Sequence, residues 1–289
     1  MRLAAPVPSA QEQRLSATAP EKGGMAENGT ARATSVPALE ARALTFSYGE
    51  NADPVFSDLS LTVGRGEVVL VMGASGSGKS TLALCLAGLY PAYAGESSGE
   101  VLAGGRAVDE MGPCERSREV SILFQNPDNQ FCMDTVEREV LFALENVGWE
   151  GDMRARCREL LSLVGLEGRA GERIGRLSGG TKQKLALCTA LACGARTLVL
   201  DEPFANLDPA SCADFSRTVR ELADEGKTIV FVTHDLDFAL VTADFVSMPF
   251  DGEIACTEPV QAFFANNIVY RPNAESRLFG EIAAEGGRA

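Results

Sequence analysis

The sequence has one histidine, one tryptophan and no two cysteines spaced as Cys-x-x-Cys. A zinc site needs closely spaced cysteine and histidine ligands, so this pattern argues against one. The eight cysteines are scattered instead, several within apolar runs, where a thiol behaves as a small hydrophobic side chain. We therefore expect reduced core cysteines in a cytosolic protein rather than a disulfide framework.

Long apolar runs and an excess of basic residues are also missing. No window reaches the roughly 18–20 consecutive apolar residues of a membrane helix, and the N-terminus lacks the apolar stretch of a signal peptide. Lys and Arg number 26 against 40 Asp and Glu, which gives a net charge of −14. This balance argues against a protein whose main role is to bind nucleic acid. We expect a soluble protein that works at a membrane only through a partner.

The 289 residues, 45% of them hydrophobic, suffice for one large α/β domain. Residues 1–37 are rich in Ala, Pro, Ser, Thr, Gly and Glu without periodicity, so we expect them to be disordered. Alternating strands and helices predict a mostly parallel sheet, and residues 134–175 have the pattern of inserted helices. The predicted strands are 43–48, 59–63, 67–72, 197–200 and one ending at 233, and the other predicted helices are 80–89 and 209–225.

Residues 73–80, GASGSGKS, match the pattern G-x-x-x-x-G-K-[ST] in full, between a predicted strand and a predicted helix. The glycines let the backbone curl so that N–H groups point at phosphate oxygens, and the helix N-terminus adds partial positive charge. Lys79 supplies a cation for the β- and γ-phosphates, and the Ser80 hydroxyl is placed for Mg²⁺. The pattern predicts a nucleoside triphosphate site.

Two acids, Asp201 and Glu202, follow the strand predicted at residues 197–200. The carboxyl ends of parallel strands meet at one edge of a sheet, so Asp201 is expected opposite Ser80, where both would hold Mg²⁺. Adjacent side chains point in different directions, so Glu202 would face the γ-phosphate and a water as a general base. The alternative is a pair of acids that caps a strand.

Residues 177–180, LSGG, precede a helix predicted to begin near Thr181. Ser178, Gly179 and Gly180 would make a second anion-binding helix N-terminus. One nucleotide is not held by two unrelated helix starts of one small domain. We therefore predict a head-to-tail dimer in which each subunit lends this segment to the nucleotide of the other.

The single histidine, His234, follows the strand that ends at Thr233. It would emerge at the same sheet edge as Asp201 and Glu202, where an imidazole can donate to a γ-phosphate and report its presence. The alternative is an ordinary surface residue at the end of a strand.

Together these motifs resemble the ATP-binding cassette (ABC) ATPases, over roughly residues 39–265. The resemblance implies an α/β fold of the P-loop NTPase type, with a mostly parallel central sheet, an antiparallel β portion and an inserted helical subdomain. It implies an ABC ATPase domain over residues 38–265, with the helical subdomain at about 132–178, and a short C-terminal tail over 266–289.

The resemblance also assigns roles to single residues. It implies that Tyr48 stacks on adenine, that Gln125 is the Q-loop glutamine, and that Asp208 contacts the nucleotide across the dimer. The implied ATP-binding residues are Tyr48, Gly73, Ala74, Ser75, Gly76, Ser77, Gly78, Lys79, Ser80, Thr81, Gln125, Asp201 and His234, with Ser178, Gly179, Gly180 and Asp208 reaching across the dimer. The expected catalytic residues are Lys79, Gln125, Glu202 and His234, and the expected Mg²⁺ ligands are Ser80, Gln125 and Asp201.

Two positions depart from the family pattern. Thr181 stands where the family usually has glutamine, and Asn206 replaces the usual small residue of the D-loop. Two assignments also have simpler alternatives, since Tyr48 could be a strand-packing aromatic and Gln125 a polar loop residue.

Residues 124–131, FQNPDNQF, continue into Asp134-Thr135-Val136 and are similar to the ATPase subunits of energy-coupling factor (ECF) importers for vitamins and metal ions, including cobalt and nickel. The resemblance implies an ATPase that powers import by dimer closure and reopening, with ATP and Mg²⁺ as cofactors. The implied partners are a second ABC ATPase (a copy or a paralogue), an integral membrane coupling subunit and a substrate-binding membrane subunit, at the cytoplasmic face of the cell membrane. The alternatives are the ATPase of another ABC transporter and a soluble ABC protein acting on ribosomes or DNA.

Overall fold

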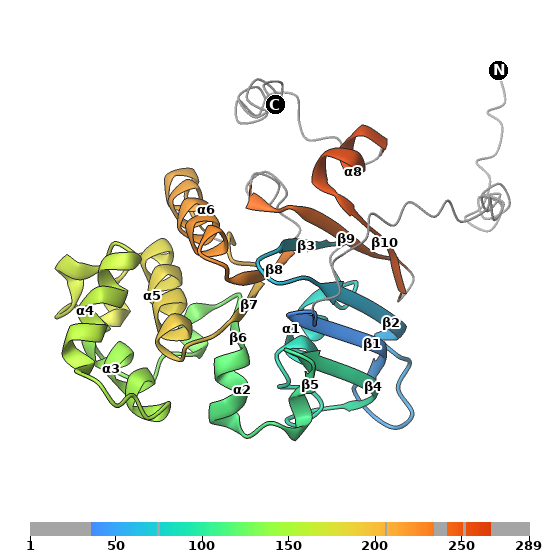
Figure 1. Ribbon diagram of the computed structural model, residues 1–289, viewed down its shortest axis with the longest axis horizontal. Helices are drawn as coiled ribbons and strands as arrows, with labels where there is room; N and C mark the ends of the chain where they lie inside the picture. Colours follow the sequence, from blue (N-terminus) through green and yellow to red (C-terminus); the bar gives the residue numbers. More distant parts are fainter. Residues whose placement is uncertain (1–35, 74–75, 206, 234–241, 251–252, 267–289) are drawn as a thin grey trace, which may run out of the picture. The chain divides into compact units, whose positions relative to one another are not determined.

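The computed structural model describes residues 36–73, 76–205, 207–233, 242–250 and 253–266 (Figure 1). The predictions for residues 1–37 and 266–289 fall almost wholly outside these ranges. A four-stranded antiparallel sheet has the order β2-β1-β4-β5. Its strands are β1 (Leu39–Ser47), β2 (Phe56–Val63), β4 (Glu96–Ala103) and β5 (Arg106–Ala107).

A second sheet has six strands in the order β10-β9-β3-β8-β7-β6. All neighbouring pairs in it are parallel except β10 and β9. Its strands are β3 (Val68–Met72), β6 (Val120–Leu123), β7 (Thr197–Asp201), β8 (Thr228–Thr233), β9 (Phe245–Phe250) and β10 (Glu253–Pro259). The predicted combination of a mostly parallel sheet with an antiparallel β portion is confirmed.

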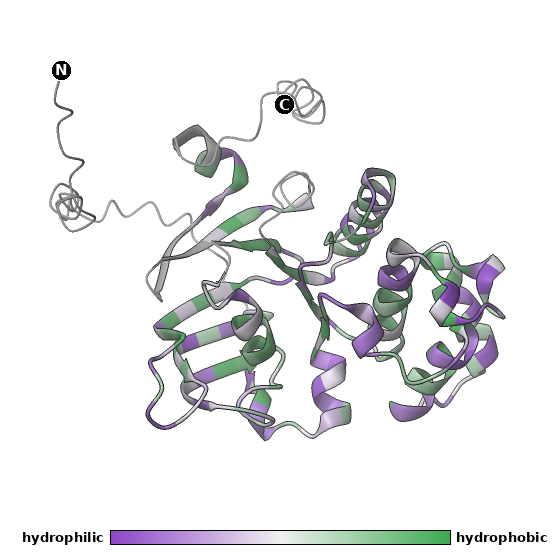
Figure 2. Cartoon of the chain, turned by 180° about the vertical axis from the view of Figure 1, so that it is seen from behind, coloured by the Kyte–Doolittle hydropathy of each residue, from purple (hydrophilic) through white to green (hydrophobic). Residues whose placement is uncertain are grey.

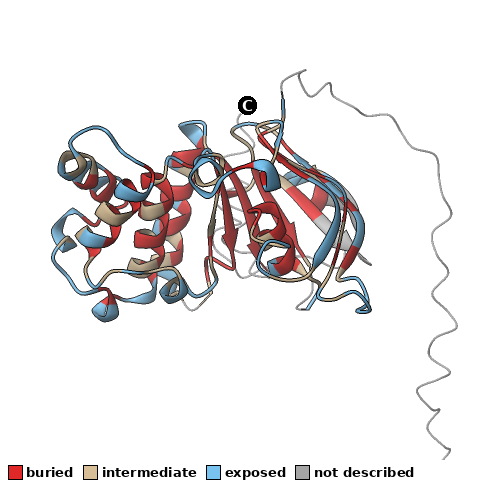
Figure 3. Cartoon of the chain, turned by 90° about the horizontal axis from the view of Figure 1, so that it is seen from below, coloured by how far each residue is buried: buried red, intermediate tan, exposed pale blue. Residues whose placement is uncertain are grey.

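Every residue of β3, β7 and β8 is buried, as expected for strands covered on both faces. Side chains alternate between the two faces of a strand, so one strand serves two cores. In β3, Leu70 joins the core built with the helical part, whereas Val69 and Val71 join the core built with the four-stranded sheet. Figure 2 shows these strands as hydrophobic, and Figure 3 shows them as buried.

The helices cover both faces of the six-stranded sheet. Buried residues of α1 lie in the core shared with the four-stranded sheet, and those of α3, α4, α5 and α6 lie in the other core. The α-helices are α1 (Lys79–Leu86), α2 (Pro113–Glu119), α3 (Val136–Asn146), α4 (Met153–Leu163), α5 (Gly179–Ala192), α6 (Pro209–Asp224) and α8 (Val260–Asn266). Short 3₁₀ helices are η2 (Val108–Glu110), η3 (Pro127–Asn129), η4 (Glu167–Arg169) and η5 (Ile174–Arg176).

The helices predicted within residues 134–175 are present as α3 and α4. On α3, Val136, Val140 and Leu144 recur every four residues and are completely buried, which gives the helix one core-facing stripe. Asp152 caps α4, because its side chain accepts hydrogen bonds from the backbone N–H groups of Arg154 and Ala155. Within the described ranges, no helix has the length and apolar character that crossing a membrane requires.

Candidate functional site

The carboxyl ends of three neighbouring strands meet at one edge of the six-stranded sheet. Met72 at the end of β3 pairs with Thr233 at the end of β8, and Asp201 at the end of β7 pairs with Val232. The strands are parallel, so all three end on the same side. The start of α1 therefore lies beside Asp201, the last residue of β7, and Glu202 directly after it.

Glycine is required in the turn that leads into α1. Gly76 and Gly78 have φ values of 83° and 84°, in the left-handed region that favours glycine. A Cβ atom on Gly78 would also lie 2.5 Å from Cγ1 of Val55, which is too close for any side chain. Among the described residues, the buried Ser77 hydroxyl has no hydrogen-bond partner. The turn thus presents an unused hydroxyl and the first N–H groups of α1, which suits a phosphate ligand.

The Lys79 side chain folds back onto the turn that precedes α1. Its Nζ donates to the carbonyl oxygen of Gly73 at 2.7 Å, and only 7% of the residue is exposed. Burial lowers the pKa of Lys79, and the negative charges of Glu202 and Asp201 oppose that shift. The ammonium therefore faces two carboxylates in a site where more negative charge, such as phosphate, would stabilise it.

Ser80 and Asp201 lie together although they are 121 residues apart in the sequence. The Ser80 hydroxyl donates to Oδ1 of Asp201 at 2.9 Å. Burial raises the pKa of Asp201 while the Ser80 hydrogen bond lowers it, and the charge of Glu202 raises it further. A hydroxyl and a carboxylate are the oxygen donors that Mg²⁺ prefers, and a cation here would favour the ionised carboxylate. The pair fits a magnesium ion.

Glu202 has an unusual backbone conformation. Its φ is 47°, in the left-handed region that non-glycine residues rarely adopt, and its N–H donates to the carbonyl oxygen of Val232 at 2.7 Å. Such strain typically persists at functional sites, where the surrounding structure holds it. The Glu202 side chain reaches the end of β8, where it contacts Thr233.

Thr233 holds the Glu202 carboxylate. Its Oγ1 donates to Oε2 of Glu202 at 2.7 Å, and both residues are buried. The sequence interpretation did not assign any role to Thr233. The available signal was a hydroxyl directly after four apolar residues, at the end of a strand predicted to lie beside the acids.

We predict that Thr233→Val lowers the maximal rate of nucleotide hydrolysis by about tenfold, since Glu202, the predicted general base, would lose part of its catalytic effect when held in the wrong orientation. Valine has nearly the shape of threonine, so nucleotide affinity should change little. Steady-state kinetics with a separate nucleotide-binding titration measure both quantities. The matched control is Thr218→Val on α6, where the buried hydroxyl donates to the carbonyl oxygen of Asp214 instead. Equal rates for the two variants would contradict the role of Thr233.

Tyr48 lies above an aromatic cluster. Its ring meets Phe46 edge-on at 5.2 Å, and its hydroxyl forms a hydrogen bond of 2.7 Å with Thr81 on α1. Phe46 in turn stacks on Tyr90 at 5.3 Å. Tyr48 remains 56% exposed, so an anchored aromatic ring is left open to a planar ligand.

The LSGG segment and Asp208 form a second group. Ser178 is the N-cap of α5 and its Oγ accepts from the N–H of Thr181, while Asp208 is the N-cap of α6. The starts of α5 and α6 lie close together. A Cβ atom placed on Gly180 would be only 2.7 Å from Cβ of Ser211. Hydrogen bonds from Ser211 lower the pKa of Asp208.

Gln125 follows β6 on an exposed stretch of chain. No hydrogen bond joins Gln125 to Ser80 or Asp201 among the described residues, and its role as a Mg²⁺ ligand stays a prediction. The residue instead lines a cavity of about 350 Å³ between the loop and the start of α5. The cavity is lined by Gln125, Asn126, Pro127, Asp128, Gly179, Lys182, Gln183, Ala205 and Leu207.

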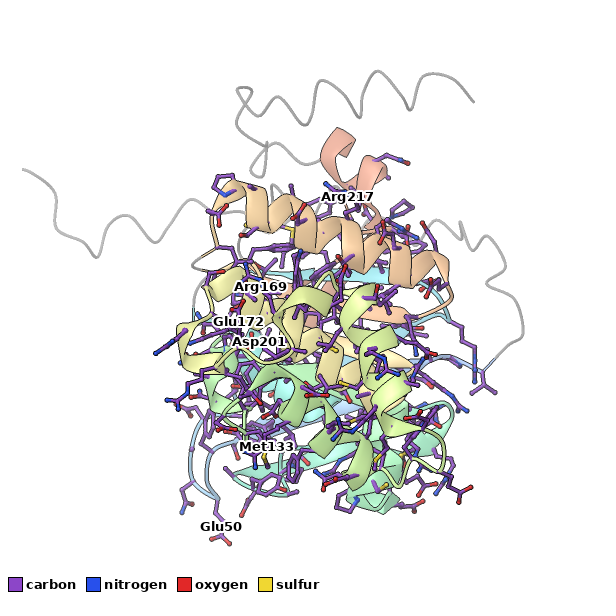
Figure 4. The ribbon with its side chains drawn as sticks, turned by 90° about the vertical axis from the view of Figure 1, so that its left-hand side faces the viewer. Glu50, Met133, Arg169, Glu172, Asp201 and Arg217 are labelled. Carbon is purple, nitrogen blue, oxygen red and sulfur yellow. The ribbon has the colours of Figure 1, made fainter. Side chains whose placement is uncertain are left out.

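The remaining predicted residues, Ala74, Ser75 and His234, lie outside the described residues, as does Asn206. Figure 4 shows Asp201 among the packed elements, whereas Glu50 projects to the outside. The structure thus brings Lys79, Ser80, Asp201 and Glu202 together, which defines a nucleotide site of the P-loop class.

Comparisons with known proteins identify the family. The ABC transporter family model matches residues 56–205, which is more than half of the chain. An "Energy-coupling factor transporter ATP-binding protein EcfA1" of Thermotoga maritima is 40% identical over 201 residues, covering 69% of this chain and 74% of that protein. A "Putative HMP/thiamine import ATP-binding protein YkoD" of Bacillus subtilis is 40% identical over 203 residues, but the match spans only 37% of that longer protein.

Comparison with solved structures leads to the same family. The chain resembles cbiO1 from Clostridium perfringens, described as part of the ABC transporter complex cbiONQ, with a TM-score of 0.70 and 25% identity over 87% of this chain and 96% of that one. It also resembles a dimeric ATP-binding cassette bound to ADP and Pi, with a TM-score of 0.67 and 26% identity over 77% of this chain and 98% of that one. The chain belongs to the ABC transporter family. It is an ATP-binding, ATP-hydrolysing transporter subunit whose relatives include ECF-type ATPases.

Proposed function

We propose that the chain powers an ECF-type importer for vitamins or transition-metal ions, as one half of an ATPase dimer. The observation that carries the proposal is the arrangement at one sheet edge, where the Ser80–Asp201 pair adjoins a Glu202 carboxylate held by Thr233. The ECF type is supported by the similarity to EcfA1, and the similarity to cbiO1, described as part of the ABC transporter complex cbiONQ, supports a transporter subunit.

Hydrolysis is achieved by positioning and electrostatics rather than by covalent chemistry. Lys79 and the N–H groups at the start of α1 bind the β- and γ-phosphates. Glu202 accepts the proton of the attacking water, while the Thr233 hydroxyl keeps its other carboxylate oxygen in place. His234 directly follows Thr233 in the sequence, and we assign to it the sensing of the γ-phosphate.

Ser80 and Asp201 would hold the magnesium ion. When bound, Mg²⁺ supplies positive charge that neutralises the β- and γ-phosphate oxygens. Gln125 would join these ligands from its exposed position after β6. Tyr48 stacks on the adenine ring from its anchored position beside Thr81.

The dimer completes each nucleotide site. Ser178, Gly179 and Gly180 at the start of α5, together with Asp208 at the start of α6, contact the nucleotide of the other subunit. The similarity to an ATP-binding cassette described as dimeric supports this arrangement. The second subunit is a copy of this chain or a paralogue.

A groove of about 320 Å³ between α2, β6, α3 and α5 is the proposed contact with the membrane coupling subunit. Its lining is apolar at Leu89, Phe142 and Ala186, and it is continuous with the segment after Gln125 through Gln130 and Cys132. An amphipathic helix seated in this groove would be moved when the loop of Gln125 moves. The substrate-binding membrane subunit would join through the coupling subunit, which places the chain at the cytoplasmic face of the membrane.

Co-purification from detergent-extracted membranes of the native host tests this proposal. The tagged chain and the control Leu163→Asp should both retain an integral membrane protein identified by mass spectrometry, since Leu163 is an exposed residue of α4 outside the groove. Phe142→Asp should lose that protein while still binding ATP, because a charge disfavours an apolar contact. Retention by Phe142→Asp would contradict the groove assignment.

Deletion of the chain should abolish uptake of a labelled vitamin or of Co²⁺ or Ni²⁺ in the native host. Unchanged uptake across a full panel of these substrates would contradict the ECF type while leaving the ATPase assignment intact.

A further inference from the structure

An ion pair joins the loop that carries Gln125 to the helix that starts at Gly179. Nζ of Lys182 lies 2.7 Å from Oδ1 and 2.8 Å from Oδ2 of Asp128, so both carboxylate oxygens are engaged. The Lys182 side chain is only 15% exposed, whereas that of Asp128 is 52% exposed. The lysine stem is thus packed against the protein while its head reaches the loop.

Both partners lie close in sequence to predicted nucleotide contacts and are hydrogen-bonded to the same local turns. Asp128 lies in η3, three residues after Gln125, and its N–H is capped by the Asn126 side chain at 3.1 Å. Lys182 lies in the first turn of α5, and its N–H donates to the carbonyl oxygen of Ser178 at 2.9 Å. A displacement of either nucleotide contact therefore changes the geometry of the ion pair.

The ion pair spans the 350 Å³ cavity rather than a tightly packed interface. Gln183 lines this cavity, is 1% exposed, and has a buried Oε1 without a hydrogen-bond partner in the described structure. No other hydrogen bond or ion pair joins residues 125–130 to residues 178–184, all of which are described. The Lys182–Asp128 pair is therefore the direct polar link between the loop and the helix.

We propose that Lys182 and Asp128 are positioning residues that couple the two nucleotide sites of the dimer. The inference rests on the proposed dimer, in which Gln125 responds to the nucleotide of its own subunit and residues 178–180 contact that of the partner. When ATP binding shifts the loop, the ion pair moves α5. The contact of residues 178–180 with the nucleotide of the partner subunit then changes. Partly exposed ion pairs contribute little to stability, so a role in coupling explains this one better than a role in folding.

The test removes and then restores the ion pair. The variants are Asp128→Asn, Lys182→Gln and the charge swap Asp128→Lys with Lys182→Asp. Hydrolysis by the purified dimer is followed against ATP concentration. We expect a wild-type Hill coefficient above about 1.5, out of a maximum of 2 for two sites, and a value near about 1 for each single variant. The ATP affinity of the separated subunits should change less than about twofold, and the swap should restore cooperativity.

The matched control is Glu159→Gln, which removes an ion pair with Arg156 inside α4 and should leave the Hill coefficient unchanged. Single variants that stay as cooperative as the wild type would overturn the inference, as would a non-cooperative wild-type dimer or a folded swap variant that fails to recover. Failure of the proposed function is distinguishable from these outcomes: failure of the importer assignment shows as unchanged uptake after deletion of the chain, and failure of the proposed dimer shows as a wild type that does not dimerise with ATP.

Discussion

Glu202→Gln should lower the rate of ATP hydrolysis by about 10²–10⁴-fold, the usual contribution of a general base. Glutamine keeps the shape of the side chain, and its amide oxygen can still accept the hydrogen bond from Thr233. It cannot accept a proton from water, so the chemical step stops while binding continues. The variant should therefore accumulate an ATP-bound dimer, visible by size-exclusion chromatography with ATP and absent with ADP.

Glu225→Gln is the control, because Glu225 is an exposed acid beyond the end of α6, at the opposite edge of the sheet. It should hydrolyse ATP at the wild-type rate and form no lasting dimer. Near wild-type turnover in Glu202→Gln would remove Glu202 from the role of base. Loss of ATP binding in that variant would instead assign Glu202 to binding.

Lys79→Met should weaken ATP binding by about 10–150-fold, the range expected for losing a hydrogen bond to a charged group, and should reduce turnover further. The phosphates would then approach Asp201 and Glu202 without the Lys79 ammonium, whose charge interacts with both carboxylates. Fluorescent nucleotide titration measures the affinity, and single-turnover hydrolysis measures the chemical step.

The affinity of the wild type should also depend on pH at the alkaline end. Only the protonated lysine attracts phosphate, and burial lowers the pKa of Lys79 in the nucleotide-free protein. As pH rises, ATP affinity should therefore fall at a lower pH than it would with an exposed lysine. The Lys79→Met variant should lack this fall. Lys184→Met on α5 is the control, since that lysine lies 3.6 Å from Asp214 on the neighbouring helix. Unchanged ATP binding by Lys79→Met would contradict the role of the lysine.

Much of the fold could be predicted because its signals are local. β3, β7 and β8 are continuous apolar runs, which is what burial on both faces of a sheet requires. The stripe on α3 has the helical period. By contrast, β4 has five exposed residues and β5 has only two residues, so neither carries a strand pattern of its own. Their pairing with neighbouring strands stabilises them, and that pairing is not visible in a local window.

The sequence by itself determined the chemistry of the site. Each part of the site requires a particular residue type at a particular place. These parts are the glycine turn before Lys79 and Ser80, the strand end with Asp201 and Glu202, and the second helix start at LSGG. Only the tertiary structure decided how these groups are held. The hydrogen bond from Thr233 to Glu202 and the Lys182–Asp128 pair each join segments that are distant in sequence. The left-handed backbone of Glu202 depends on the neighbouring strand β8. Such contacts depend on which strand ends and helix starts the packed core brings together, and no local pattern of residues encodes that.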